Sequence, residues 1–178
     1  MIFRFLFVVA VSVSFDSCVN DPETVKSMTG MQQLPMQTAR DVDLLYSDSA
    51  KLKIHLKAPR VDEFGGSKPY TVMPIGVKVE FFDSEGKIDS YLSADHAVRR
   101  DREQTMEARG NVELLSVEGK KLNTDHLNWD GTSRRIFTDA FVTITTADQV
   151  IMGTGLEADD MLENYTIKNI TGSFLLNE

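Results

Sequence analysis

The chain has 178 residues, of which 42% are hydrophobic and 26% are charged, so it can form one domain with a packed core plus a tail or anchor. Its net charge of −8 argues against nucleic acid as a partner, because phosphates call for a basic face. Local basic clusters at Arg99, Arg100 and Arg102 and at Arg134 and Arg135 fall in apparent turns. We interpret them as solubilising surface, with contact to an anionic headgroup or partner as the alternative.

The first segment of the chain is a short apolar run. Residues 2–15 are almost wholly apolar with Arg4 near the start, which is too short to cross a bilayer core of roughly 20 residues but suits a secretory signal. Cys18, the single cysteine, follows directly and resembles the acylated cysteine of a bacterial lipoprotein, although Asp16 stands where a small neutral residue is usual. We predict a lipoprotein signal peptide at 1–17 and a lipid anchor at Cys18. The alternative is an ordinary signal with an incidental thiol.

The next segment is predicted to be a tether. Residues 18–43 show no clear period and contain Pro22 and Pro35, which indicates a flexible, lipid-anchored linker that keeps the folded part clear of a membrane. Residues 38–44 allow a short helical turn at most. The folded domain is therefore expected over residues 44–178.

Alternation with period two begins at Leu44. In the run 51–57, every second residue is apolar, and Pro59 is expected to end this strand. A loop is expected at 61–70, followed by a second alternating strand at 77–81 and a turn at 83–87. With Cys18 used as an anchor, no cysteine remains for a disulfide or a zinc site, so this domain must rely on its core.

The remaining sequence continues as short strands separated by turns. Gly110 interrupts one of them, and residues 130–132 form a hairpin tip. No stretch beyond residue 44 sustains a helical period. This predicts an antiparallel all-β domain in which one face of the sheet is buried and the other is exposed to solvent. The expected strands are 88–94, 97–102, 106–117, 122–129, 136–138, 140–146, 150–152, 155–158, 165–170 and 174–176.

One short phrase recurs along the second half of the chain. The pairs Ala94-Asp95, Thr124-Asp125 and Ala158-Asp159 stand roughly 30 residues apart, a period typical of one supersecondary unit stacked on itself. Such a β-stack offers a long surface or trough rather than a compact catalytic pocket. The repeat therefore indicates a protein that holds or passes on a ligand.

Several segments in a fixed order resemble the LptC family, the periplasmic proteins of the lipopolysaccharide export machine. The resemblance covers about residues 44–176 and implies an open, twisted antiparallel β-jellyroll of stacked strands with a V-shaped section. Well-known members carry a membrane-spanning N-terminal helix, whereas this chain has a short signal and Cys18. The segments are 45–47, 81–86, 110–114, 122–130, 136–139 and 153–159.

The resemblance also implies a function. The domain would receive lipopolysaccharide from the inner-membrane ABC transporter, hold its acyl chains in an apolar trough and pass it to a periplasmic bridge protein of the same fold. Unpaired edge strands suit such a partner, because they accept an added strand. The expected trough lining is Leu52, Ile54, Leu56, Val77, Val79, Phe81, Val112, Leu114, Val142 and Ile144.

We therefore expect a non-enzymatic, membrane-anchored lipoprotein of the Gram-negative periplasm, with the inner membrane favoured over the outer and without cofactor or metal. One alternative is an envelope lipoprotein that binds glycan or scaffolds other proteins. Another is the bridge protein itself.

Candidate catalytic groups have a structural interpretation that we favour. Asp95-His96, Asp125-His126 and His55 could form acid–base or metal sites, but the two pairs fall at equivalent points of the repeat. The carboxylates of Glu157 with Asp159-Asp160, and of Asp130 with Asp139, could serve a glycosidase but suit turns of an acidic protein equally. The aromatic residues Phe81, Trp129, Phe137, Phe141 and Tyr165 could stack on sugars, although packing in the core or trough is favoured.

Overall fold

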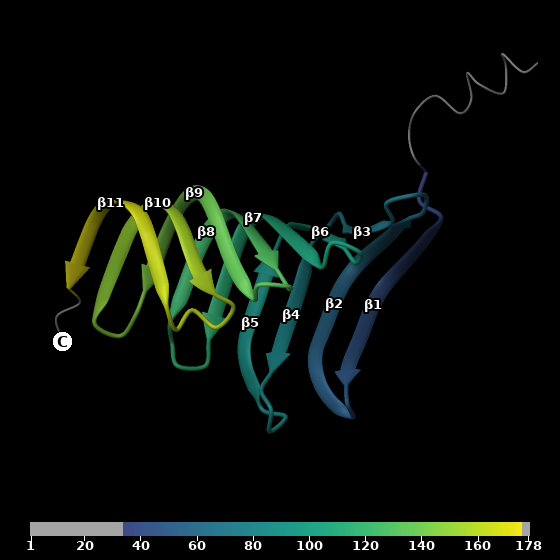
Figure 1. Cartoon of the computed structure of the whole chain (residues 1–178), viewed down its shortest axis with the longest axis horizontal. Coiled ribbons are helices and arrows are strands. Elements are labelled where there is room, and N and C mark those ends of the chain that lie inside the picture. Colours follow the sequence, from purple (N-terminus) through teal and green to yellow (C-terminus); the bar gives the residue numbers. More distant parts are fainter. Residues whose placement is uncertain (1–33, 176–178) are drawn as a thin grey trace, which may run out of the picture. The chain divides into compact units, whose positions relative to one another are not determined.

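The computed structural model describes residues 34–175, which form one antiparallel sheet of 11 strands (Figure 1). This confirms the predicted all-β class and is consistent with a β-jellyroll. The signal peptide, Cys18 and most of the tether lie outside the described residues. No helix that could span a membrane occurs in residues 34–175.

The strands follow one another along the chain with short turns between them. Their bounds are β1 (Gln37–Asp48), β2 (Lys51–Phe64), β3 (Tyr70–Met73), β4 (Val77–Phe82), β5 (Ile88–Ala94), β6 (His96–Arg100), β7 (Thr105–Ser116), β8 (Lys121–Asp130), β9 (Arg135–Thr145), β10 (Gln149–Asp159) and β11 (Tyr165–Leu175).

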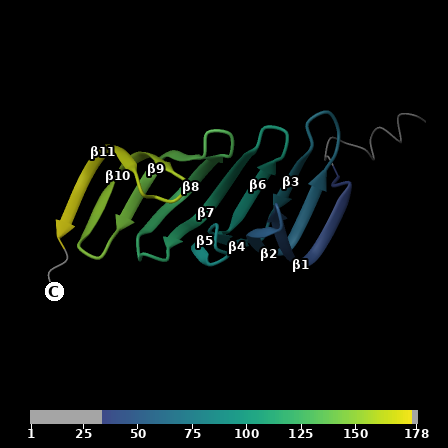
Figure 2. The same cartoon turned by 60° about the horizontal axis from the view of Figure 1, so that its bottom comes forward.

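The connectivity is a meander of bent strands (Figure 2). Strands β3 and β4 pair with the two halves of β2 and are the two halves of one bent strand. Strands β6 and β5 pair with the two halves of β7 in the same way. Every bent strand thus pairs with its neighbours along the chain, which leaves β1 and β11 as the edges of the described sheet.

A line of corners divides the sheet into two half-sheets. In β7 the corner is Gly110 and Asn111, both with positive φ (73° and 46°), and the pairing register with β8 shifts there. A Cβ on Gly110 would lie 2.9 Å from the Asp95 carboxylate, which accepts a hydrogen bond from Asn111 Nδ2 at 2.7 Å. In β10, Gly155 (φ 80°) marks the corner, where the register with β9 also shifts. These two corners therefore need residues that tolerate a left-handed backbone.

These corners explain where the sequence-based boundaries were wrong. The segments predicted as separate strands at 136–138 and 140–146 are one strand, β9, and those at 150–152 and 155–158 are one strand, β10. Strand β2 continues through Pro59 to Phe64, into the segment expected to be a loop. Pro59 stands at the corner opposite Asp41, where the pairing between β1 and β2 is interrupted. Its missing N–H therefore removes no hydrogen bond between these strands.

The boundary of the domain also differs from the prediction. Strand β1 begins at Gln37 rather than after residue 43, so the end of the predicted tether, including the possible helical turn at 38–44, is an extended strand. It pairs along its whole length with β2, and this tertiary pairing overrides a weak local pattern.

Two of the three copies of the repeat phrase occupy equivalent positions in the structure. Asp95 and Asp125 lie at corners of the sheet, where the register shifts between neighbouring strands. Asp159 instead ends β10, and its carboxylate accepts hydrogen bonds from the backbone N–H groups of Glu163 and Asn164. The third copy is therefore a turn cap rather than a structural equivalent.

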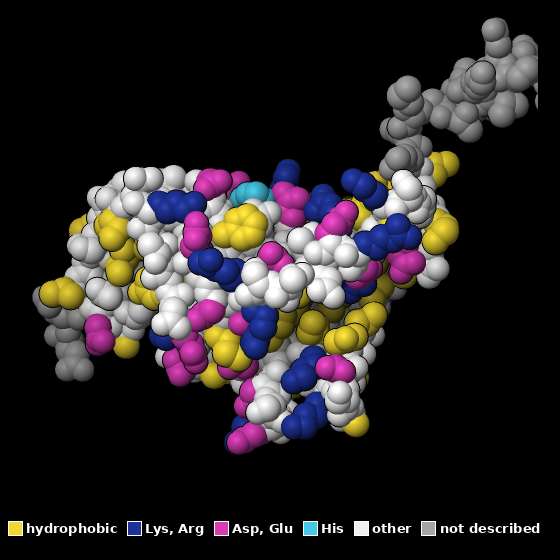
Figure 3. Space-filling model, in the orientation of Figure 1, with side chains coloured by type: hydrophobic (Ala, Val, Ile, Leu, Met, Phe, Trp, Pro, Cys, Tyr) yellow, Lys and Arg dark blue, Asp and Glu magenta, His cyan; other side chains and the backbone are white. Residues whose placement is uncertain are grey.

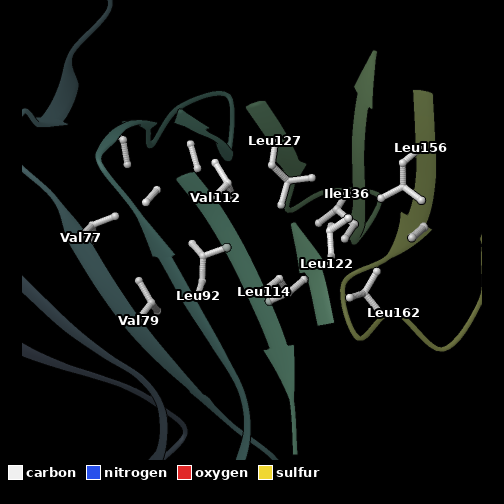
Figure 4. Close-up of a cluster of buried hydrophobic side chains, with 14 of the residues drawn as sticks. Val77, Val79, Leu92, Val112, Leu114, Leu122, Leu127, Ile136, Leu156 and Leu162 are labelled. Atoms are coloured by element: carbon white, nitrogen blue, oxygen red, sulfur yellow. The ribbon is translucent and has the colours of Figure 1, made fainter. Parts of the chain in front are cut away.

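The core lies between the two half-sheets (Figure 4). In one half-sheet, directly paired residues form an apolar row that crosses nearly the whole sheet, because opposite residues of paired antiparallel strands share a face. The other half-sheet supplies a facing row that includes Met73, Ala97, Ala108, Leu127 and Leu156. The first row, which we call the apolar row, comprises Leu44, Leu56, Val79, Leu92, Leu114, Leu122, Ile144 and Ile151.

Candidate functional site

The apolar row is the most extended feature of the inner face, and its solvent exposure changes along the sheet. At the β1 end Leu44 is 43% exposed, and Leu56 beside it is half-buried. In the middle of the sheet Leu122 is completely buried. The same row is thus open at one end and closed in the centre.

The open end is formed by β1, β2 and β4. Figure 3 shows hydrophobic side chains gathered over these strands. On β1, Val42, Leu44 and Tyr46 pair with Ala58, Leu56 and Ile54, so they share the inner face. Leu44 and Tyr46 stay exposed because β1 is an edge strand with a partner on one side only.

The closed part extends from β4 to β10. Val112 and Val142 are fully buried, and Ile144 is 1% exposed. The side chains of the two half-sheets bury one another here, so these residues present no apolar surface to a ligand.

The structure divides the predicted trough residues between these two regions. Leu52, Ile54, Leu56 and Phe81 are half-buried near the open end. The inner-face residues Val42, Leu44 and Tyr46 were not predicted, because Val42 fell in the predicted tether and the apolar Leu45 obscures the alternation around it. The alternation Val42, Leu44, Tyr46 was the signal that could have identified them. The other predicted residues lie in the closed core: Val77, Val79, Val112, Leu114, Val142 and Ile144.

His55 lies on the outer face of the open end and joins three strands. Its Nε2 is 2.6 Å from an oxygen of Asp43 on β1, and its Nδ1 is 2.9 Å from an oxygen of Glu80 on β4. The hydrogen bonds with Asp43 and Glu80 raise the pKa of His55 above its ordinary value of 6.5. The imidazolium therefore helps to fasten the edge strand β1 to β2 and β4.

The second histidine–carboxylate contact is on the outer face of the other half-sheet. His126 Nε2 is 2.9 Å from Glu107, which also forms an ion pair with Arg109. Burial acts to raise the pKa of Glu107, but the hydrogen bonds from Arg109 and His126 together lower it. Because its charge is compensated on two sides, this carboxylate ties β7 to β8.

The acidic residues considered as catalytic pairs are also engaged in structural contacts. Glu157 forms ion pairs with Arg135 and Lys168, each at 3.2 Å. Asp130 accepts a hydrogen bond from the backbone N–H of Thr132 at 2.8 Å, and hydrogen bonds from the turn lower its pKa. Within residues 34–175, no cluster of three or more His, Cys, Asp or Glu side chains is arranged to hold a metal ion.

The aromatic residues separate into two groups. Phe81 and Tyr165 pack against the core, as expected. Phe137 and Phe141 instead lie on the outer face of β9, 44% and 52% exposed, so the prediction that they line the interior was wrong. Their neighbours Ile136, Thr138 and Val142 take the inward positions of that strand.

Comparison with known families assigns this architecture. A family model described as lipopolysaccharide-assembly, LptC-related, matches residues 5–174. The chain belongs to the LptC family. No curated protein matches the sequence. Membership in the LptC family implies a role in lipopolysaccharide transport at the cell envelope, in a family of transport components rather than enzymes.

Proposed function

We propose that this LptC-family chain is a non-enzymatic subunit that receives lipopolysaccharide from the inner-membrane ABC transporter. It holds the acyl chains on its inner apolar face and passes them to a periplasmic bridge protein of the same fold. The observation that carries this proposal is the apolar row, which is continuous across the sheet and exposed at β1.

The exposed end suits a lipid acyl chain energetically. Leu44 and Tyr46 are about half exposed on the inner face, beside the half-buried Ile54 and Leu56. Covering such surface with a hydrocarbon chain gains about 0.8 kcal/mol for each methylene group removed from water. Acyl chains therefore bind first at the β1 end, where apolar surface is already available.

The two edges of the sheet suit handover between proteins. Strand β11 is the edge opposite β1 along the sheet, and its Ile170 and Phe174 are 63% and 58% exposed. An added strand from a bridge protein would pair with such an edge and continue the sheet, so that the lipid stays on one apolar surface.

An N-terminal lipid anchor would keep the domain at a membrane. We place this anchor at Cys18, after a signal peptide at 1–17, and favour the inner membrane because the proposed donor is there. Mass spectrometry of the mature N-terminus tests the acylation. A free or absent Cys18 in the mature protein would contradict it.

Depletion and complementation in the host bacterium test the proposed function. Depletion is expected to leave lipopolysaccharide at the inner membrane, and re-expression of the unaltered chain to restore its arrival at the surface. Leu44→Asp places a charge on the exposed inner face and is expected to restore transport poorly. Leu45→Asp is the matched control, because Leu45 pairs with His55 on the outer face and is 63% exposed.

Each result of these experiments tests a different part of the proposal. Unchanged lipopolysaccharide at the surface after depletion would contradict a role in transport. Equal restoration by Leu44→Asp and Leu45→Asp would contradict the inner face as the lipid-binding surface. Co-purification with the inner-membrane transporter distinguishes the proposed subunit from the bridge protein.

Glycan binding is a second candidate, favoured by the outward position of Phe137 and Phe141 on β9. Exposed aromatic rings on a sheet face can stack on sugar rings. If this candidate is correct, the unaltered chain is retained on a glycan array and a double replacement by Ala abolishes the retention. No retention of the unaltered chain would contradict it.

A further inference from the structure

The loop between β10 and β11 contributes one large side chain to the core. Leu162 is 1% exposed and belongs to the core cluster, although it lies in a loop and not in a strand. Figure 4 shows its side chain pointing into the interior that Leu122 and Leu156 occupy. Its backbone has φ 56°, a left-handed conformation that is unfavourable for a leucine.

The loop is fastened at its two ends by polar contacts. The Asp159 carboxylate accepts hydrogen bonds from the backbone N–H of Glu163 at 2.8 Å and from the backbone N–H and side-chain amide of Asn164 at 2.9 Å. Asp160 forms an ion pair with Arg134 of the β8–β9 turn, with Nε and Oδ2 3.0 Å apart. An ion pair near the surface contributes little, so the hydrogen bonds to Asp159 are the main polar contacts that hold the loop.

The rest of the loop makes little contact with the core. Met161, Glu163 and Asn164 are exposed, so Leu162 is the loop's main connection to the interior. A cleft of about 780 Å³ borders the loop and is lined by the ends of β9, β10 and β11. Because these three loop residues are exposed, an outward movement of the loop removes only the side chain of Leu162 from the core.

We propose that Leu162 fills a place in the C-terminal part of the interior that a lipid acyl chain takes during transfer. This inference rests on the proposed function. A leucine side chain is branched hydrocarbon, so the site it fills has the chemistry to accept an acyl chain. Outward movement of the β10–β11 loop vacates the site, and the left-handed backbone at Leu162 is relieved in the same step.

The consequence is that the two ends of the interior behave differently. The β1 end is exposed without any rearrangement, so lipid binds there directly. Passage toward the β11 edge requires the loop to release Leu162. The loop thus acts as an autoinhibitory contact on the delivery side of the domain.

Photo-crosslinking in the full-length protein during transport tests this inference. One crosslinker replaces Leu44 at the open end, and another replaces Tyr165, which lines the cleft beside the loop and packs against the core. The measured quantity is the yield of lipopolysaccharide adduct at Tyr165 divided by the yield at Leu44. It is compared between the unaltered loop and the variants Leu162→Ala and Asp159→Ala.

Both loop variants are expected to raise this ratio by roughly tenfold. The loss of one charge-assisted hydrogen bond, or of a contact of similar strength, shifts the equilibrium between the closed and the open loop by about this factor. Leu127→Ala is the control, because it removes a similarly buried leucine from a strand, lies outside the apolar row and leaves the loop intact. It is expected to leave the ratio unchanged. Thermal unfolding confirms that each variant is folded, and Asp159→Ala, which keeps Leu162, decides the question if Leu162→Ala does not fold.

An unchanged ratio in the folded loop variants, with a clear adduct at Leu44, would overturn the inference and leave the proposed function standing. A rise of the same size in Leu127→Ala would also overturn it, because any loosening of the core would then suffice. Absence of adduct at Leu44 in every variant would overturn the proposed function and this inference with it.

Discussion

The β1 end and the C-terminal part of the sheet are built from the same alternating pattern, yet one is open and the other is closed. On β1, Leu44 has a partner strand on one side only, whereas Leu122 on β8 lies between paired strands on both sides. The facing half-sheet and Leu162 of the β10–β11 loop cover the C-terminal part. The position of a strand in the sheet, rather than its alternating pattern, therefore decides whether its apolar face is core or binding surface.

Replacement of one leucine in each region gives the largest expected contrast. Leu122→Ala is expected to lower the free energy of unfolding by about 2–5 kcal/mol, since it leaves a cavity in a closed core. Leu44→Ala is expected to lower it by less than about 1 kcal/mol, because that side chain is already 43% exposed. Urea unfolding measures both. Equal losses would show that the two regions are packed alike.

Replacement of two glycines near the β11 edge tests how closely β10 and β11 approach each other. A Cβ on Gly153 would lie 2.5 Å from the Asn169 carbonyl oxygen and from Ile167, so Gly153→Ala is expected to cost about 1–3 kcal/mol by pushing β11 away. On Gly172 the nearest atom would be 3.6 Å away, and its backbone is not left-handed. Gly172→Ala is therefore expected to be neutral or to stabilise by about 0.5 kcal/mol.

Thermal unfolding of the two glycine variants, with hydrogen exchange of the β11 amides, measures this difference. Loss of protection is expected in β11 of Gly153→Ala and not in β1. A stable Gly153→Ala with unchanged exchange would contradict the close approach of β10 and β11.

The attachment of β1 is expected to depend weakly on pH through His55. Hydrogen bonds to Asp43 and Glu80 raise its pKa in the folded protein above 6.5. The stabilisation is therefore complete below about pH 6.5 and is lost as the pH rises through the folded-state pKa. Carboxylates such as Asp62 and Asp83, whose pKa values are lowered, affect stability only at more acidic pH.

Urea midpoints at about pH 6 and about pH 8.5 test this expectation. The unaltered chain is expected to be less stable at the higher pH, and His55→Gln is expected to lose this part of the pH dependence. An identical pH dependence in His55→Gln would show that the histidine does not fasten β1.

The fold was predictable from the sequence because alternation is local, and the strands at 88–94 and 77–82 were placed nearly as observed. The corners were harder, since Gly110, Pro59 and Gly155 interrupt the pattern in the same way that loops do. In the structure the strand bends at these positions and continues. Only pairing between distant segments distinguishes a bend from a break.

The sequence predicted which kind of residue faces inward, but not which part of the inner face is exposed. Residues such as Val112 and Val142 have the inward phase expected of a lining, but phase alone does not tell a trough from a closed core. Leu162 could not have been identified, because its role depends on a loop that folds back onto the sheet. Leu44 and Tyr46 were missed because the apolar Leu45 between them obscures the alternation of this strand.

The central claim is that lipopolysaccharide meets this domain at the exposed β1 end of the apolar row. The most direct measurement is the yield of lipopolysaccharide adduct from a photo-crosslinker placed in turn at Leu44, Leu56, Leu92 and Leu122, with Leu45 as the outward-facing control. We expect the highest yield at Leu44, a decline toward Leu122 and none at Leu45. A yield at Leu45 equal to that at Leu44, or a maximum at Leu122, would contradict it.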